Sequence, residues 1–220
     1  PKEKAMSIKS EALRYLGHKD QNIPDDQMQL MDSVIEETLM VAEPKTVHRI
    51  FDIERRDGRI VIPADIDLNT DDLKRLLIRS QAVMLIGGTL GLSIDRKLRY
   101  YSKTDATRMI IMDAVASALI EEVCDTLQSN LPFEHYTFRF SPGYGDVPLT
   151  MQKDLLRVLD AGRRIGLSLT SSLLMVPQKS ITGVVGIGDK ELNRNRSCDG
   201  CRLIEQCEYR KKGTVCYKTN

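Results

Sequence analysis

Residues 139–149, RFSPGYGDVPL, combine a cation, a sharp turn and an aromatic side chain within a few positions. The planar guanidinium of Arg139 suits a carboxylate held by two hydrogen bonds. Pro142 and Gly143 turn the chain and leave nearby backbone groups available to a ligand. Tyr144 adds a ring for stacking and a hydroxyl for a polar contact. The segment therefore predicts a site for a small molecule that carries a carboxylate, and the alternative is a tight turn with a surface ion pair and a packed tyrosine.

A second group of reactive side chains lies near the end of the chain. Four of the five cysteines have the spacing Cys-x2-Cys-x5-Cys-x8-Cys, at Cys198, Cys201, Cys207 and Cys216. Four thiolates can close a tetrahedral zinc site or hold an iron-sulfur cluster, and spacing alone does not separate the two. We favour the cluster, and the alternative is a set of unligated or disulfide-bonded cysteines. The fifth, Cys124, is expected to be a buried small side chain.

Composition excludes several classes of function. With 32 Lys and Arg against 31 Asp and Glu, the formal charge is +1, which argues against nucleic acid as the main partner. The longest apolar stretch, residues 82–94, is shorter than the roughly 20 residues of a membrane span. The first residues lack the apolar core of a secretion signal. We therefore expect a cytoplasmic protein without a membrane segment.

Hydrophobic periodicity predicts the elements that position these residues. Helices are expected at 8–16, 26–42, 70–79, 105–128 (capped by Thr104) and 151–163; strands are expected at 47–53, 59–62, 82–86, 135–140, 173–176 and 181–187. Arg56-Asp57-Gly58 should form a hairpin turn between the first two strands. The sequence GGTLG at 87–91 is expected to be a turn from a strand into a helix.

The segment 135–140 alternates cleanly, which places His135, Thr137 and Arg139 on one open face of a strand. Helices and strands mix without a strict βαβ rhythm. The predicted fold is α+β, with a mixed, largely antiparallel sheet and flanking helices.

Two stretches of the chain are similar to one known family. RFSPGYGDVPL resembles the R-P-A-P-G-Y-P-x-x-P signature of the activation domain of cobalamin-dependent methionine synthase, and residues 166–183, GLSLTSSLLMVPQKSITG, resemble its G-M-x-L-T-E-S-x-A-M-x-P-x-x-S-V-S-G stretch. The resemblance covers about residues 80–188 and is to the free-standing versions of this domain. It implies a domain over residues 1–190, followed by a cysteine-rich tail over 191–220.

The resemblance implies a role for each residue of the turn. Arg139 would hold the carboxylate of S-adenosylmethionine, and the backbone around Ser141 would contact its adenosine part. Pro142 shapes the turn, Gly143 permits close approach, and Tyr144 would lie toward the corrin ring. No acid–base residue is needed for the methyl transfer, because the sulfonium is already a good leaving group.

The resemblance also implies partners. The chain would dock on a separate cobalamin-binding methionine synthase, or on another corrinoid protein, and support the reductive methylation of cob(II)alamin. A flavodoxin-type protein would supply the electron. The resemblance thus implies a methyltransferase-associated role, and it does not itself assign an enzymatic activity to the chain.

The chain departs from the family pattern at identifiable positions. An acidic residue and a histidine that follow the family signature are Leu149 and Thr150 here, and paired tyrosines after the last strand are Asp189 and Lys190. Asp95 and Asp105 are the candidates for the acid that meets the ligand's ammonium. An iron-sulfur or zinc-bearing interaction or electron-transfer protein for another corrinoid protein is the alternative function, and a domain that binds no small molecule is a third.

Overall fold

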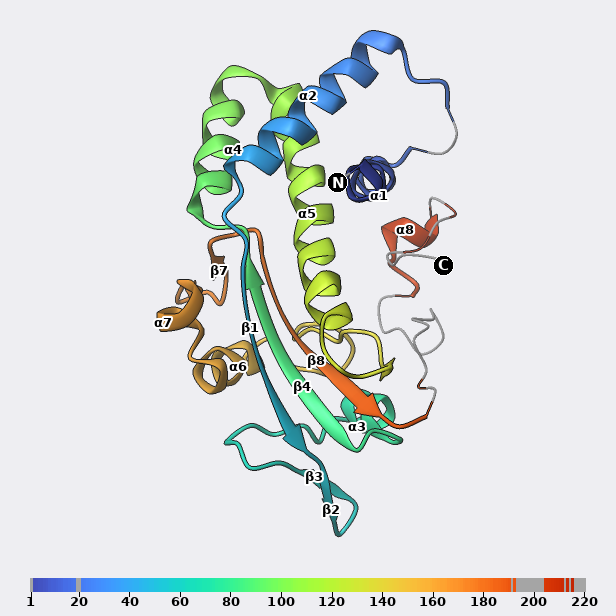
Figure 1. The fold of residues 1–220 in the computed structure, drawn as a ribbon, viewed down its shortest axis with the longest axis vertical. Helices are drawn as coiled ribbons and strands as arrows, with labels where there is room; N and C mark the ends of the chain where they lie inside the picture. Colours follow the sequence, from blue (N-terminus) through green and yellow to red (C-terminus); the bar gives the residue numbers. More distant parts are fainter. Residues whose placement is uncertain are drawn as a thin grey trace. The chain divides into compact units, whose positions relative to one another are not determined.

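The computed structural model describes residues 2–18, 21–190, 192, 204–211, 213 and 215 (Figure 1). The helices are α1 (Lys2–Tyr15), α2 (Asp25–Val41), α3 (Asp71–Leu77), α4 (Leu92–Thr104), α5 (Ala106–Ser129), α6 (Met151–Leu159), α7 (Ala161–Ile165) and α8 (Glu208–Lys211). The strands are β1 (Lys45–Asp52), β2 (Glu54–Arg56), β3 (Arg59–Val61), β4 (Ala82–Thr89), β5 (His135–Tyr136), β6 (Ser168–Leu169), β7 (Met175–Val176) and β8 (Ser180–Gly188). Among these residues no helix is both long enough and apolar enough to cross a membrane.

One four-stranded sheet has the order β1-β4-β8-β5, and β2–β3 and β6–β7 form two separate hairpins. Neighbouring strands of the sheet run in opposite directions (Figure 1). At one edge, β5 pairs antiparallel with β8, with His135 opposite Gly188 and Tyr136 opposite Ile187. The predicted α+β class with a largely antiparallel sheet is therefore confirmed.

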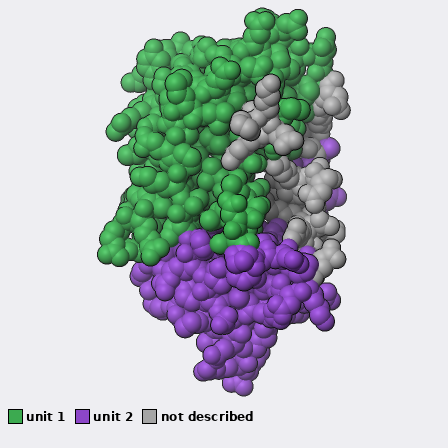
Figure 2. Space-filling model, in the orientation of Figure 1, with its two compact units in different colours: residues 1–47, 87–131, 160–181 green, residues 48–86, 132–159, 182–220 purple. Residues whose placement is uncertain are grey.

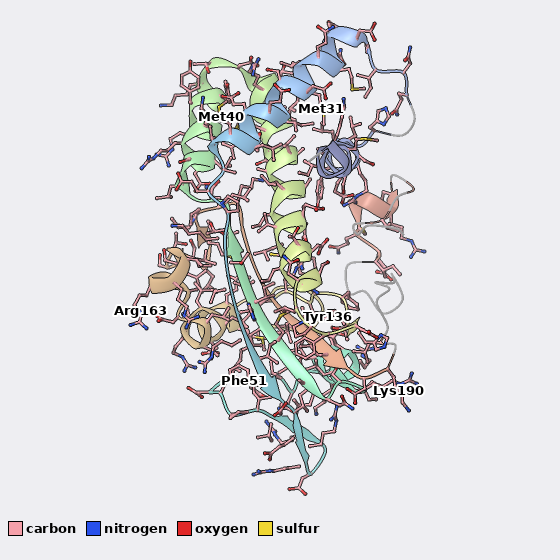
Figure 3. All side chains as sticks on the ribbon, viewed as in Figure 1. Met31, Met40, Phe51, Tyr136, Arg163 and Lys190 are labelled. Carbon is pink, nitrogen blue, oxygen red and sulfur yellow. The ribbon has the colours of Figure 1, made fainter. Side chains whose placement is uncertain are left out.

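The chain divides into two compact units (Figure 2). Unit 1 comprises residues 1–47, 87–131 and 160–181. Its core is a cluster of apolar side chains from α1, α2, α4 and α5, and α5 contributes Met112, Val115 and Ala116, each fully buried. Helix α2 has a buried face and an exposed face, as its spacing of apolar residues predicts. Met31 is 4% exposed, whereas Met40 is 79% exposed (Figure 3).

Unit 2 comprises residues 48–86, 132–159 and 182–220. Its apolar core includes Leu73 and Leu77 of α3, Leu85 of β4, Leu155 of α6 and Val185 of β8, all fully buried. The predicted binding turn, residues 139–144, belongs to this unit.

Local sequence signals give the expected backbone at two places. Asp57 and Gly58 both have positive φ, of 50° and 73°, as a two-residue hairpin turn requires, and they join β2 to β3. Thr70 caps α3 and accepts a hydrogen bond from Leu73 N at 3.4 Å.

Three predicted boundaries are wrong. Thr104 ends α4, and the cap of the longest helix is Asp105, whose carboxylate accepts from Arg108 N. The predicted helix at 151–163 is divided at Asp160, which has the left-handed φ of 51° that interrupts a helix. The GGTLG segment continues β4 through Thr89, because small residues fit beside α5: a Cβ on Gly88 would lie 3.0 Å from Cys124 Sγ.

Candidate functional site

The segment before the turn follows β8 with one interruption in its pairing. After Tyr136, Thr137 N donates to Gly186 O at 2.9 Å, and Gly186 N donates to the Thr137 hydroxyl at 2.8 Å. The next pair is Phe140 with Val184, which exchange two backbone hydrogen bonds of 2.9 and 2.8 Å. Two residues, 138 and 139, therefore lie opposite the single residue 185. This is the arrangement of a β-bulge, which redirects the side chains that it carries.

The bulge changes the exposure expected for this strand. The regular strand ends at Tyr136, and the alternation predicted through residue 140 is wrong. Thr137 is 4% exposed and Arg139 is 6% exposed, so the open face predicted for them is also wrong. Arg139 is instead a buried cation next to an exposed turn.

Gly183 of β8 makes room for the Arg139 side chain. A Cβ on Gly183 would lie 2.6 Å from Arg139 Cγ and 3.2 Å from Arg139 Cδ. No side chain can occupy that position while the arginine stem stays in place. Gly183 is the last residue of 166–183, the second stretch that resembles the family. The motif therefore pointed to this glycine, but its contact with Arg139 was not predicted.

The turn itself is folded by its own backbone. Gly143, with φ of 90°, donates its N–H to Val147 O at 2.9 Å, and Tyr144 N donates to Ser141 O at 3.4 Å. The expectation that the turn leaves these amides available is therefore wrong for Gly143 and Tyr144. Pro142 is buried, Ser141 is partly exposed and the Tyr144 side chain is 61% exposed.

Asp146 ties the end of the turn to the start of α3. Its carboxylate accepts from Asp71 N at 2.7 Å and from Asp72 N at 3.2 Å, and Asp146 N donates to Asp72 Oδ2 at 2.9 Å. Burial raises the pKa of Asp146, but hydrogen bonds from the Thr70 hydroxyl and from these two amides outweigh it, and the pKa lies below its ordinary value. The sequence alone gave no signal for this contact.

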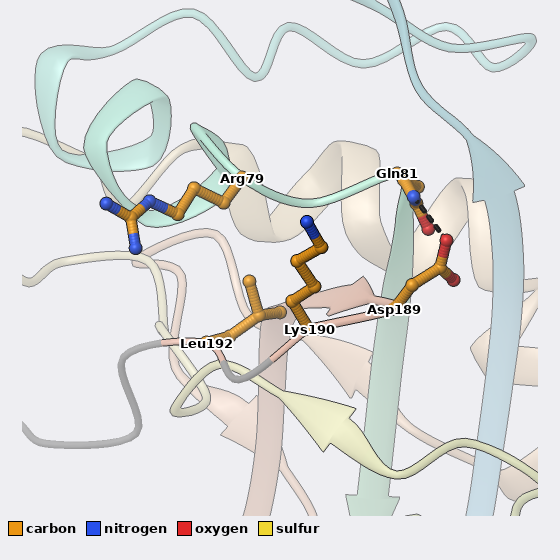
Figure 4. Close-up of a pocket in the computed structure, with 5 residues that line it drawn as sticks. All are labelled: Arg79, Gln81, Asp189, Lys190 and Leu192. Carbon is orange, nitrogen blue, oxygen red and sulfur yellow. Dashed lines mark hydrogen bonds between the residues drawn. The ribbon is translucent and has the colours of Figure 1, made fainter.

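A hollow of about 440 Å³ lies elsewhere in unit 2 (Figure 4). It is lined by Arg79, Gln81, Asp189, Lys190 and Leu192. Gln81 Nε2 donates to Asp189 Oδ2 at 2.5 Å. Asp189 and Lys190 therefore give the hollow charged side chains in its wall.

The two acids considered for the ligand's ammonium both belong to unit 1 and have structural contacts. Asp95 Oδ2 accepts from Gln178 N at 2.9 Å, and Asp105 caps α5. Each of the two carboxylates therefore has at least one structural hydrogen bond.

Most of the predicted metal site lies outside the described residues, since Cys198, Cys201 and Cys216 are not among them. Cys207 is described, is partly exposed and forms no disulfide. Within the described part of the chain, no group of three or more His, Cys, Asp or Glu residues could hold a metal ion. The cysteine-rich tail as a separate domain stays a prediction.

Together, the fold and the turn define an α+β protein that presents a buried arginine beside an exposed aromatic turn. A family model described as "Vitamin B12 dependent methionine synthase, activation domain" matches residues 80–191, which is half of the chain. The chain belongs to this family, as its sequence motifs predicted.

Two further comparisons concern whole proteins. No curated protein matches the chain significantly. Among solved structures, the "Crystal Structure of the MetH Reactivation Domain bound to AdoHcy" has a TM-score of 0.59 and 17% identity, and the similarity covers 89% of this chain and 75% of that one. At this identity the likeness shows the fold.

Proposed function

We propose that this chain binds S-adenosylmethionine at the segment Arg139–Tyr144. The observation that carries the proposal is the buried Arg139, which the bulge and Gly183 hold directly before the turn. A guanidinium in such a setting forms strong, bidentate hydrogen bonds with a carboxylate, because little water competes for it.

The remaining residues of the turn fit the other parts of that ligand. Ser141 is a partly exposed residue whose backbone would contact the adenosine part, and Pro142 and Gly143 would set the shape of the turn. The Tyr144 ring is exposed, as a side chain that meets a second molecule would be. When bound, S-adenosylmethionine supplies a methyl group on a sulfonium that leaves readily, so the contribution of the chain is to position it.

The family relationship supports a partner that carries the acceptor. We propose that the chain docks on a separate cobalamin-binding methionine synthase, or on another corrinoid protein, and supports the reductive methylation of cob(II)alamin there. The electron would come from a flavodoxin-type protein. This activity requires no general acid or base from the chain itself.

Isothermal titration calorimetry with S-adenosylmethionine tests the binding proposal. R139A should weaken binding by about two orders of magnitude, as expected for loss of a buried charge-assisted contact. R139K keeps the charge but not the planar fork, and should fall between R139A and the unmodified protein. The matched control is R49A, which removes another arginine of unit 2, one that donates to Val158 O at 3.1 Å. Equal affinities in R139A and R49A would contradict the proposal.

The tail carries a separate proposal, in which Cys198, Cys201, Cys207 and Cys216 bind an iron-sulfur cluster or zinc. Metal analysis and visible absorbance of anaerobically purified protein distinguish the two. Substitution of all four cysteines by serine should abolish the bound metal, and metal retained by that variant would contradict the assignment.

A further inference from the structure

Helix α3 is held at each end by a side chain from a distant part of unit 2. Asp146, which follows the turn, binds the first backbone amides of the helix. Arg55, on the β2–β3 hairpin, binds its last carbonyls: Arg55 Nη2 donates to Leu77 O at 2.8 Å, to Ile78 O at 3.2 Å and to Ser80 O at 2.7 Å. An anion at the amino end and a cation at the carboxyl end both complement the helix dipole. The two clamps are similar in kind, but only the first touches the turn.

The contact at the amino end is reciprocal. Asp146 accepts from the amides of Asp71 and Asp72, and its own amide donates to the Asp72 carboxylate at 2.9 Å. Asp72 is further fixed by an ion pair with Arg75 at 2.5 Å. Hydrogen bonds in both directions fix the orientation of the backbone at residue 146 as well as its distance from α3.

Gly145 makes this close approach feasible. Its φ is 53°, and a Cβ built on it would lie 1.9 Å from Asp72 Oδ2 and 3.2 Å from Phe140 Cζ. A Cβ at this position would displace either the Asp72 carboxylate or the turn, and in both cases the contact with Asp146 N would be disturbed. Gly145 and Asp146 directly follow Tyr144, so their fixed backbone determines where the end of the proposed binding segment lies.

Apart from hydrogen bonds within its own backbone, the turn is largely exposed. Gly143, Tyr144 and Gly145 are exposed, and within residues 141–147 only Pro142 and Val147 are buried. Ordering a flexible backbone on binding costs conformational entropy. A turn that is already ordered binds its ligand without that cost.

We propose that Asp146 is a positioning residue for the ligand-binding turn: by holding residues 145 and 146 against the amino end of α3, it keeps Gly143 and Tyr144 in their binding conformation. Asp146 acts through α3 and the backbone, and its carboxylate is already engaged by Asp71 and Asp72. The inference rests on the proposed function, since it concerns affinity for S-adenosylmethionine.

The test compares three full-length variants by calorimetry with S-adenosylmethionine and by urea unfolding. D146A should raise Kd about tenfold, which corresponds to the loss of one or two ordered residues. D146N keeps an oxygen acceptor for the α3 amides and should restore Kd to within about threefold of the unmodified protein. R55A removes the clamp at the other end of the same helix, and should lower the free energy of unfolding while leaving Kd within about twofold.

Hydrogen exchange of the ligand-free protein gives a second measurement. The amides of Gly143 and Val147 donate hydrogen bonds within the turn, so their protection reports whether the turn is ordered. D146A removes the contact that holds the turn, and these amides should lose protection. R55A leaves that contact in place, and they should keep it.

Two results would overturn the positioning role alone: unchanged affinity and exchange in D146A, or equal loss of affinity in D146A and R55A. Absence of binding by the unmodified protein, or full binding by R139A, would instead overturn the proposed function on which it rests.

Discussion

Two partly buried carboxylates, Glu37 in unit 1 and Asp146 in unit 2, hold their surroundings together in different ways. Glu37 accepts from Lys97 Nζ at 2.7 Å, from the Tyr101 hydroxyl at 2.7 Å and from Arg108 Nη1 at 3.3 Å. Asp146 accepts chiefly from backbone amides of α3. The contacts of Glu37 join side chains of α2, α4 and α5, whereas those of Asp146 fix the path of a turn.

The pKa of each carboxyl group reflects this difference. Burial raises the pKa of Glu37, but hydrogen bonds from Lys97 and Tyr101 and the charges of Lys97 and Arg108 bring it below its ordinary value. For Asp146 the lowering comes from the Thr70 hydroxyl and backbone amides, against the opposing effect of burial. The pKa of Glu37 therefore depends in part on neighbouring charges, whereas that of Asp146 depends on uncharged donors, the Thr70 hydroxyl and backbone amides.

The surroundings of the two carboxylates explain what each one does. Glu37 lies among helices that already share an extensive apolar core, and there an ion pair adds stability to a packing that hydrophobic contacts define. Asp146 lies beside an exposed turn with few apolar contacts, where hydrogen bonds select the conformation. A polar contact of similar kind can thus stabilise one region and position another.

The largest expected loss of stability is for a substitution of Gly145, which differs from other glycines of positive φ in its close contact with Asp72. G145A introduces a Cβ that would meet Asp72 Oδ2 at 1.9 Å, so the Asp72 carboxylate must move from the position in which it accepts from Asp146 N. The free energy of unfolding in urea should fall by about 2–4 kcal/mol, from backbone strain and overpacking together.

The matched control is G58A in the hairpin turn, where φ is 73° and no atom lies within 4 Å of the added Cβ. It should cost about 1 kcal/mol from strain alone. Equal losses in G145A and G58A would show that the contact with Asp72 does not constrain the turn.

A smaller effect is expected in the helical unit. E37Q removes the charge between Lys97 and Arg108 but keeps an acceptor for Tyr101, and should lower the free energy of unfolding by about 1–3 kcal/mol. E36Q, on the exposed side of α2, is the control and should change it by less than about 0.5 kcal/mol. If both variants unfold like the unmodified protein, the charge cluster contributes nothing to unit 1.

The smallest effect is a dependence on pH. Because the pKa of Asp146 is lowered in the folded state, its contribution to stability is present in full above the ordinary aspartate value of about 3.9, and is lost as the pH falls toward the lower folded value. D146N should therefore lose less stability than the unmodified protein when urea unfolding is compared between neutral and acidic pH. Parallel loss in the two proteins would contradict the assigned pKa direction.

The sequence predicted the fold where local signals and tertiary structure agree. Apolar periodicity gave α2 and α5, the Asp57-Gly58 pair gave the hairpin turn, and Thr70 gave the start of α3. In each case the determining residues lie within a few positions of one another, so a pattern in the chain contains the information.

The details of the site depended on contacts that no local pattern contains. The alternation at 135–140 fits a regular strand, and only the pairing with Val184 and Gly186 shows the bulge that buries Arg139. The hydrogen bonds between Asp146 and the start of α3 join residues more than 70 positions apart, so only the folded chain reveals them. The candidate binding segment, residues 139–144, could therefore be predicted from the sequence, and the contacts that position it could not.

The proposed site depends most on one contact, that of Arg139 with the carboxylate of S-adenosylmethionine. Titration with S-adenosylmethionine and with its decarboxylated analogue, in the unmodified protein and in R139A, isolates this one contact. The unmodified protein should prefer the carboxylate-bearing ligand by about two orders of magnitude, and R139A should show no preference. Equal binding of both ligands by the unmodified protein, or an undiminished preference in R139A, would contradict it.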